Sequence, residues 1–265
     1  MMMTRLRLMF SAALAAVAIA ASGVAATPAA AYPDSPASRF LELKNGQVRQ
    51  WTYNSGNYSV YNLPLSPANP SQSSIRLVAG LDDNHFLAVS SGDHSLYLWS
   101  WGYNTWRATW MDGGWDNTRL ITSLDSHTFL SVTYAGALMK WSLNPDNPAQ
   151  ITWFGQIGNG WGYARAIAGL GQYNGSARFV EVRSDTGQFR EWQQPSPTAY
   201  PTIVATMNSG LGATRQLAGM GLTEFVEVDS AGLLLRWTPN ANENVGGWVR
   251  DYQTGSGWGV DNPLG

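Results

Sequence analysis

Hydrophobic and polar residues form short strand-like segments along most of this chain, and one such segment recurs five times. Each copy opens with Phe, reads FLEL, FLAV, FLSV, FVEV or FVEV, and is followed eleven to thirteen residues later by Trp. Such β-prone runs, separated by turn residues, predict strands rather than helices. The five pairs are Phe40 and Trp51, Phe86 and Trp99, Phe129 and Trp141, Phe179 and Trp192, and Phe225 and Trp237.

A turn residue separates Phe from Trp in each copy. In four copies a glycine lies five residues before Trp, at Gly46, Gly136, Gly187 and Gly232. Glycine readily adopts the positive φ angles of tight hairpins, so we expect two antiparallel strands joined there. The second copy has His94 at that position and Gly92 two residues earlier. This difference predicts a shifted or bulged hairpin.

A second motif follows the hairpins and predicts two further strands per repeat. Its loops read MDGGWDNTR, IGNGWGYAR, MNSGLGATR and TGSGWGVDN. A hydrophobic residue upstream of each loop marks a third strand, and an arginine four residues after the loop's Trp or Leu precedes a strand of the next repeat. The hydrophobic residues are Trp106, Trp153, Ile203 and Trp248, and the arginines are Arg119, Arg165 and Arg215. The first repeat lacks the loop and has Gln72 at the corresponding offset.

The spacing of the repeats predicts the fold. Successive Phe positions differ by 46, 43, 50 and 46 residues, which is the period of a propeller blade. We therefore expect an all-β chain with almost no helix, a single five-bladed β-propeller of four-stranded antiparallel blades. The expected repeat units are 38–74, 75–118, 119–164, 165–214 and 215–265. The offset of six residues from Trp258 falls on Leu264, so the C-terminal residues are expected to pair near the Phe40 strand and close the ring.

Residues 1–31 have the pattern of a secretory signal peptide. Arg5 and Arg7 precede an alanine-rich apolar stretch, and Ala29 and Ala31 are the small residues that signal peptidase requires before Tyr32. An uncleaved membrane anchor is the alternative, because the stretch approaches the ~20 residues that span a bilayer. Its weakly apolar composition favours cleavage. We expect a secreted chain of residues 32–265 without a membrane span.

Composition argues against several kinds of site. The chain has no cysteine, which excludes disulfides, thiolate metal ligands and cysteine nucleophiles. A net charge of −2 argues against nucleic acid as a partner. His85, His94 and His127 follow no metal-ligand pattern, and His85 and His127 are expected in solvated turns. We infer no metal and no cofactor.

Three glutamates raise the question of catalysis. Glu42, Glu181 and Glu227 share the third position of the Phe strand, where the other copies have Ala88 and Ser131. They can line a central channel, as glycosidase carboxylates, or pair with strand arginines such as Arg39, Arg165 and Arg215, which is the favoured alternative. A glycosidase needs two carboxylates with different pKa values, whereas residues repeated from blade to blade are alike. We predict that the chain is not an enzyme.

The loops suggest carbohydrate binding instead. An exposed Trp ring offers an apolar face to the C–H side of a sugar, and neighbouring polar groups bind its hydroxyls. Packing between blades is an equally good explanation for the loop tryptophans, and the five strand tryptophans are expected in the core. The candidate sugar-binding residues are Trp115 with Asp112 and Asn117, Trp161 with Asn159 and Tyr163, and Trp258 with Ser256 and Asn262.

The repeat length, the five copies and the Gly-Gly-Trp or Gly-x-Gly-Trp loops resemble the tachylectin-type five-bladed propellers. The motif falls on Gly114–Trp115, Gly158, Gly160–Trp161, Gly255 and Gly257–Trp258, and is interrupted at Gln72 and Leu211. The resemblance implies a secreted multivalent lectin whose partners are glycans or glycoconjugates with N-acetylated sugars such as N-acetylglucosamine. An extracellular scaffold that binds cell-surface or extracellular proteins is the alternative, and a glycosidase is less favoured. Loop tryptophans buried between blades would favour the scaffold.

Overall fold

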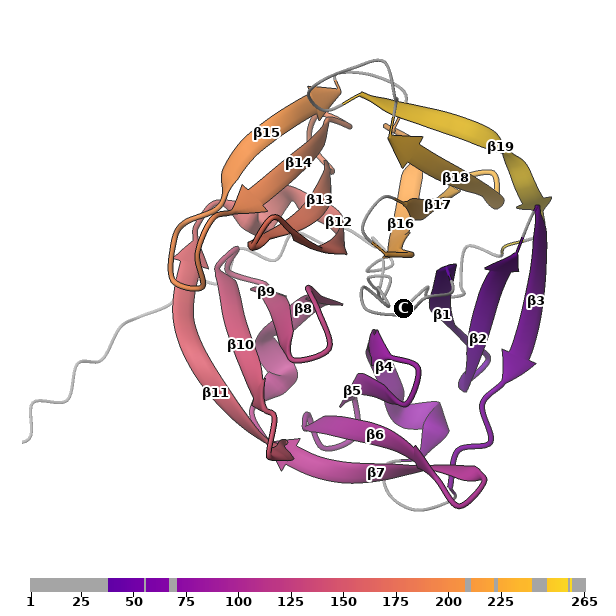
Figure 1. Cartoon of the computed structure of the whole chain (residues 1–265), viewed down its shortest axis with the longest axis vertical. Helices are drawn as coiled ribbons and strands as arrows, with labels where there is room; N and C mark the ends of the chain where they lie inside the picture. Colours follow the sequence, from indigo (N-terminus) through magenta and orange to yellow (C-terminus); the bar gives the residue numbers. More distant parts are fainter. Residues whose placement is uncertain are drawn as a thin grey trace, which may run out of the picture.

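Five antiparallel sheets surround one axis in the computed structural model (Figure 1). The structure describes residues 38–54, 56–66, 71–207, 211–221, 224–239, 247–256 and 258. The expected signal peptide, its cleavage site at Tyr32, the candidate residue Asn262 and the expected ring-closing position Leu264 lie outside these residues. The described part contains no α-helix, and so no helix that would be long and apolar enough to cross a membrane. The expected five-bladed all-β propeller is confirmed.

Four blades have four strands each, ordered from the axis outward (Figure 1). The second blade comprises β4 (Ile75–Asp82), β5 (His85–Ser90), β6 (Leu96–Gly102) and β7 (Thr105–Asp112). The third comprises β8 (Thr118–Ser123), β9 (Thr128–Thr133), β10 (Leu138–Asn144) and β11 (Asn147–Gly158). The fourth comprises β12 (Ala164–Tyr173), β13 (Ser176–Arg183), β14 (Phe189–Gln194) and β15 (Thr202–Met207). The fifth comprises β16 (Thr214–Gly219), β17 (Phe225–Asp229), β18 (Leu233–Pro239) and β19 (Trp248–Ser256).

The first blade has three described strands, β1 (Ser38–Lys44), β2 (Gln47–Asn54) and β3 (Asn57–Asn62). Phe40 on β1 faces Trp51 on β2, just as Phe86 on β5 faces Trp99 on β6. β1 therefore corresponds to the second strand of the other blades. The expected pairing of the C-terminal residues with β1 would supply the innermost strand, but those residues lie outside the described part.

The hairpin between the second and third strands keeps one register throughout, because Phe and Trp are direct partners in all five blades. Gly136 and Gly187 turn with φ angles of 79° and 65°. His94 has a φ of 55° and takes the same left-handed conformation, and the β5–β6 ladder contains no register shift. The shifted or bulged hairpin expected in the second blade is therefore wrong: its strands pair in the common register and are joined by a turn of residues 91–95.

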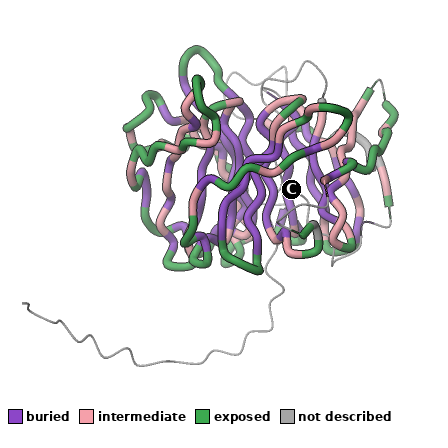
Figure 2. Tube along the Cα trace, turned by 90° about the horizontal axis from the view of Figure 1, so that it is seen from below, coloured by how far each residue is buried: buried purple, intermediate pink, exposed green. Residues whose placement is uncertain are grey.

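Each blade is held in the core by its own Phe–Trp pair. The five Phe side chains are fully buried, and the ring planes of each pair lie within 12° of parallel with centroids 5.7 to 6.3 Å apart. Offset stacks of this kind add to the area that aromatic residues bury. Figure 2 shows buried segments through the middle of the sheets, with exposed residues gathered at the loops of both faces.

Candidate binding sites at the blade seams

A short 3-10 turn closes the seam between neighbouring blades on one face of the disc. η1 (Gln72–Ser74), η2 (Trp115–Asn117) and η3 (Trp161–Tyr163) each lead into the innermost strand of the next blade. Gly114 and Gly160 precede η2 and η3 with a φ of 81°, a conformation that favours glycine. The first repeat was expected to lack this loop, and η1 shows that this expectation is wrong. We call η1, η2 and η3 the seam turns.

The loop tryptophans are buried between blades. Trp115, Trp161 and Trp258 are 3%, 4% and 7% exposed. Each ring packs on the Phe–Trp pair of the following blade, with centroid distances of 4.9, 4.8 and 4.6 Å to Trp141, Trp192 and Trp51. In the fourth repeat Leu211 is fully buried at the same position. These rings therefore pack between blades, which was one of the two expected alternatives, and none of them presents a free face for a sugar.

Two blades receive no loop tryptophan, and in both an outer strand provides a substitute. Trp106 of β7 lies 5.0 Å from Phe86, and Trp248 of β19 lies 4.9 Å from Phe225, measured between ring centroids. These are the blades that follow Gln72 and Leu211. The sequence shows the two gaps but not which residue fills them, because Trp153, which precedes its loop in the same way, is exposed.

Main-chain hydrogen bonds fix η2 and η3 to both neighbouring blades. The Trp161 N–H donates to the Gly136 carbonyl at 3.0 Å, and the Tyr163 carbonyl accepts from the Ser184 N–H at 2.7 Å. Trp115 N–H donates to the His94 carbonyl at 2.8 Å in the same way. The residue at the glycine position of the hairpin therefore also accepts a main-chain hydrogen bond from the seam turn.

Arginines complete this arrangement. Arg119 donates from Nη2 to the Trp161 carbonyl at 2.9 Å and also bonds the Ala164 carbonyl. Arg76 and Arg165 bond main-chain carbonyls of the next seam in the same manner, including Thr118 at 2.7 Å and Thr214 at 2.9 Å. Burial lowers the pKa of Arg76 and Arg119. Arg76 stands four residues after Gln72, the same offset as the arginines noticed in the sequence.

The repeated glutamates are structural acceptors. Glu42, Glu181 and Glu227 are buried and accept the indole Nε1–H of Trp51, Trp192 and Trp237 at 2.8, 3.1 and 2.8 Å. The expected pairing with Arg39 and Arg165 does not occur. Arg39 forms an ion pair with Asp83 at 2.7 Å, and Arg165 donates to main-chain carbonyls. Glu42 instead lies 3.8 Å from Arg49. Burial raises the pKa of Glu181 and Glu227.

The same position explains one unpartnered atom. Ser131 accepts from Trp141 Nε1 at 2.9 Å, whereas Ala88 offers no acceptor and Trp99 Nε1 is buried without a hydrogen bond. The residue two positions after each strand Phe (Glu, Ala, Ser, Glu and Glu in chain order) therefore determines whether the indole N–H of that blade has an acceptor. The sequence comparison set the glutamates against one another, whereas their partner is the Trp that pairs with the Phe two residues earlier.

The polar candidates of the loops are more open than the tryptophans. Asn117, Asn159, Tyr163 and Ser256 are exposed, and Asp112 is half-buried.

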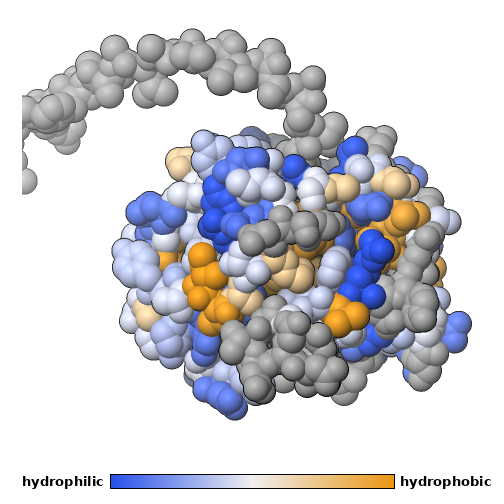
Figure 3. All heavy atoms as spheres, turned by 90° about the horizontal axis from the view of Figure 1, so that it is seen from above, coloured by the Kyte–Doolittle hydropathy of each residue, from blue (hydrophilic) through white to orange (hydrophobic). Residues whose placement is uncertain are grey.

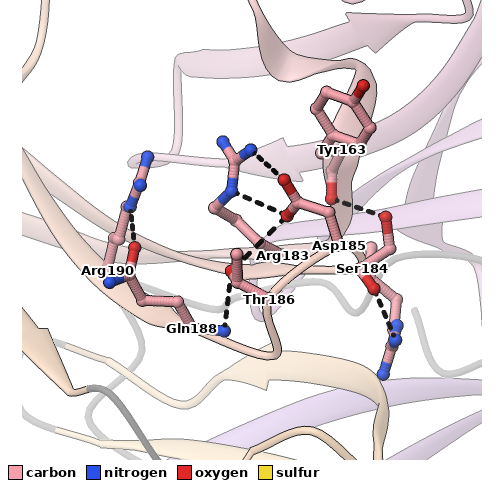
Figure 4. A network of polar contacts seen from close by, with 8 residues as sticks. Tyr163, Arg183, Ser184, Asp185, Thr186, Gln188 and Arg190 are labelled. Carbon is pink, nitrogen blue, oxygen red and sulfur yellow. Dashed lines mark hydrogen bonds and ion pairs between the residues drawn. The ribbon is translucent and has the colours of Figure 1, made fainter.

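Tyr163, at 56% exposed, belongs to a polar cluster that Figure 4 shows. The Arg183 guanidinium lies 5.3 Å from the Tyr163 ring centroid and bonds both carboxylate oxygens of Asp185, at 2.9 and 2.5 Å. Ser184 Oγ donates to the Tyr163 carbonyl at 3.0 Å. We call Tyr163, Arg183, Ser184 and Asp185 the Tyr163 cluster.

The hydrogen bonds between Arg183 and Asp185 favour the charged forms of both side chains. The hydrogen bonds from Arg183 lower the pKa of the exposed Asp185 carboxyl, and the same bonds raise the pKa of Arg183. Arg183 covers part of one side of the Tyr163 ring, a cation–π contact that restricts the ring's orientation. The cluster thus presents an aromatic edge beside hydroxyl, carboxylate and guanidinium groups.

The histidines form no metal centre in the described part. His85 Nδ1 contacts Asp82 Oδ1 at 2.9 Å, and the exposed His127 Nδ1 contacts Ser126 Oγ at 2.7 Å, both at hairpin turns. The described residues contain no group of three or more His, Asp or Glu side chains arranged to hold a metal ion.

The fold defines the class of protein, a five-bladed β-propeller. No protein-family model matches the chain, and no curated protein matches it. Among solved structures it resembles human WBSCR16, with 13% identity and a TM-score of 0.45, covering 84% of this chain and 65% of that one. It also resembles a putative 6-phosphogluconolactonase from Bacteroides uniformis, with 11% identity and a TM-score of 0.48, covering 82% and 67%. Yeast RCC1 (Prp20), in its complex with Kap60, has 13% identity and a TM-score of 0.40, covering 73% and 52%. The chain thus spans about two thirds or less of these proteins, and likeness at this level carries no statement about function.

Proposed function

We propose that this chain is a secreted, non-catalytic, lectin-like propeller that binds glycans, and that the Tyr163 cluster is one of its sites. The observation that supports the proposal is an exposed aromatic ring held rigidly beside neutral and charged hydrogen-bonding groups. A pyranose offers C–H groups to such a ring and hydroxyls to such neighbours. N-acetylated sugars, which the tachylectin-like repeat suggests, add an amide that Asn159 and main-chain groups can bind.

The buried residues support the non-catalytic part of the proposal. The three repeated glutamates are engaged with indole N–H groups, so they do not face a common ligand space. In this proposal the loop tryptophans hold the seam turns in place. The sugar contacts are made by exposed residues beside them, such as Tyr163. The η2 seam has the same main-chain hydrogen bond, with the tyrosine on the hairpin instead of the turn: the exposed Tyr134 donates its N–H to the Asn117 carbonyl at 2.9 Å. Several weak sites of this kind would act together through avidity.

A protein-interaction scaffold is the second candidate. The burial of Trp115, Trp161 and Trp258 favours it, since the repeated motif is then explained by blade packing alone. Its partners would be cell-surface or extracellular proteins.

A glycan array probed with residues 32–265 tests the proposal, followed by titration of the best glycan with Tyr163→Ala. We expect that variant to bind about fivefold more weakly, and the loss to be larger on a multivalent surface than for the free monosaccharide. Tyr173→Ala is the matched control, because Tyr173 is also exposed and has Arg178 stacked at 4.7 Å but stands on the β12–β13 hairpin. Absence of glycan binding by the unaltered protein would leave the scaffold as the better proposal.

A further inference from the structure

The outermost strands expose large hydrophobic side chains around the circumference of the disc. We use the term rim for the outward surface of β3, β7, β11, β15 and β19. Every one of these strands exposes at least one such residue, and in the second and third blades it is tryptophan, with Trp110 57% and Trp153 58% exposed. The other residues are Val60 and Tyr61 on β3, Phe154 on β11, Ile203 on β15 and Val249 on β19.

Unlike the strand and loop tryptophans of the core, the two rim tryptophans are not packed against a Phe–Trp pair. Trp153 faces Trp141 across the β10–β11 ladder and Trp110 faces Tyr97 across β6–β7. Neither ring stacks on another aromatic ring within the described part of the chain. Trp110 Nε1 donates to Ser95 Oγ at 3.2 Å, which orients that ring. β7 and β11 are neighbours on the circumference (Figure 1), so the two exposed rings belong to adjacent blades.

The rim around these rings is almost free of charge. β3, β11 and β15 contain no charged residue. β7 contains only Arg107 and Asp112, and β19 only Arg250 and Asp251. Thr, Ser, Asn and Gln provide neutral donors and acceptors instead, as in the β11 sequence NPAQITWFGQIG. A polyanion or an acidic peptide requires a cluster of cationic side chains that these strands do not have.

Polar residues also lie between the exposed apolar ones. Trp110 and Trp153 each follow an exposed threonine, Thr109 and Thr152. On the side drawn in Figure 3, which is the β15 and β19 edge of the disc, hydrophobic residues lie in small separate groups among hydrophilic ones. Stable protein interfaces usually have a contiguous apolar core, whereas isolated aromatic rings among neutral polar groups do not supply one. The chemistry fits a ligand that alternates C–H faces with hydroxyls and carries no charge.

We infer that the rim binds a neutral polysaccharide, with Trp110 and Trp153 as the stacking residues and the hydroxyl and amide side chains of β7 and β11 as hydrogen-bonding partners. An extended chain or a particle surface engages both rings at once, whereas a monosaccharide engages one. The rim is separate from the Tyr163 cluster, which lies at a seam turn. Binding here therefore adds a second mode of carbohydrate contact to the proposed function.

A depletion assay with suspended cellulose and chitin particles tests this inference, with a carboxylated polysaccharide of similar particle size for comparison. We expect retention of the unaltered protein on the neutral particles and little change on addition of salt. The double variant Trp110→Ala/Trp153→Ala should be retained about tenfold more weakly. Tyr103→Ala is the matched control, because Tyr103 is the most exposed aromatic of the same blade but stands in the β6–β7 turn.

Further variants separate ring stacking from a loss of fold. Trp153→Tyr, which keeps a flat ring, should restore part of the retention that Trp153→Ala loses, at an unchanged melting temperature. Equal retention of the double variant, elution by salt, or preference for the carboxylated particles would overturn the inference. Binding of soluble array glycans without retention on either neutral particle would overturn it while leaving the Tyr163 proposal intact. A rim substitution that released a protein partner but no polysaccharide would identify the rim as a protein interface.

Discussion

A single side-chain position, two residues after each strand Phe, decides how the buried indole in that blade is satisfied. Glu42, Glu181 and Glu227 accept the indole proton, Ser131 does the same, and Ala88 leaves Trp99 Nε1 without a partner. A buried donor without an acceptor costs about 1 to 3 kcal/mol of stability. The second blade therefore carries a local defect that its sequence reveals once the pairing is known.

Replacing Ala88 by Ser should remove this defect. We expect Ala88→Ser to raise the free energy of unfolding by about 1 kcal/mol, the usual net worth of one hydrogen bond. Urea unfolding of the two proteins measures the difference. Ala168→Ser is the control, because Ala168 is equally buried but its blade already pairs Trp192 with Glu181. Destabilisation by both substitutions would contradict the expectation.

The buried glutamates should give stability an unusual pH dependence. Burial raises the folded-state pKa of Glu181 and Glu227 above the ordinary value of 4.5. For a carboxyl group with a raised folded pKa, the stabilising contribution is fully present below the unfolded pKa and is lost as pH rises through the folded pKa. The two groups therefore favour the folded protein less as pH rises above 4.5.

Glutamine keeps the carbonyl acceptor for the indole but cannot ionise. We expect Glu181→Gln/Glu227→Gln to flatten the decline of the unfolding free energy between pH 4.5 and neutrality, as measured by urea titrations across that range. Glu181→Ala should instead destabilise at every pH, since it leaves Trp192 Nε1 unpaired. An unchanged pH slope in the glutamine variant would show that these carboxyls do not govern it.

At the scale of the element, the unit of stability is the seam turn with the two hairpins that bind it. Gly136 turns the β9–β10 hairpin with a φ of 79°, and a Cβ there would lie 2.5 Å from the Gly162 main-chain nitrogen. The sequence predicted the first requirement from the position of the glycine. It gave no sign of the second, because the contacting turn is more than twenty residues further along the chain.

These two requirements can be separated by comparing glycines. Gly175 also has a positive φ, of 75°, but a Cβ there would meet no heavy atom within 4 Å. Both alanine variants share the cost of a left-handed L residue, and only Gly136→Ala adds the collision. We expect Gly136→Ala to lower the free energy of unfolding by about 2 kcal/mol more than Gly175→Ala, measured in urea. Equal losses would mean that the seam turn can move away at little cost.

The loop tryptophans show where sequence reasoning stopped at this scale. A Gly-x-Gly-Trp loop fixes the turn, but the turn alone does not determine whether the ring points outward or inward. The deciding partner is the Phe–Trp pair of the next blade, as with Trp161 against Phe179 and Trp192. The repeated arginines gave the one signal of that contact, since Arg119 holds the Trp161 carbonyl.

For the whole molecule, the period of the Phe–Trp pairs was sufficient to predict the number of blades and their arrangement. The first blade departs, with three described strands and its Phe on β1, because the described part of the chain begins that blade at the second strand. The seam between the fifth and first blades is closed by side chains from distant parts of the sequence. Arg236 stacks 4.3 Å from the Tyr53 ring centroid and donates to its hydroxyl at 3.1 Å.

This seam should be the weakest point of the ring. Trp258 packs on Trp51 with ring centroids 4.6 Å apart, much as Trp161 packs on Trp192 at 4.8 Å. The described strands of the fifth and first blades, however, come from opposite ends of the sequence, whereas the other blades joined by a seam follow each other directly. Both alanine variants should lose about 3 to 5 kcal/mol, as core aromatic truncations do. We expect only Trp258→Ala also to lower the urea m-value and to hasten proteolysis of the first blade. Matching m-values and digestion rates in the two variants would contradict this.

The arginine contacts across the seams have a consequence for how the blades can evolve. Arg76, Arg119 and Arg165 bind main-chain carbonyls of the neighbouring blade, and the contact is made whether the receiving turn begins with Trp or with Leu211. A carbonyl is present whatever the side chain, so substitutions in one blade do not remove the acceptor that its neighbour needs. Duplicated blades can therefore diverge one at a time, and a new binding surface can arise on one of them without compensating changes in the next.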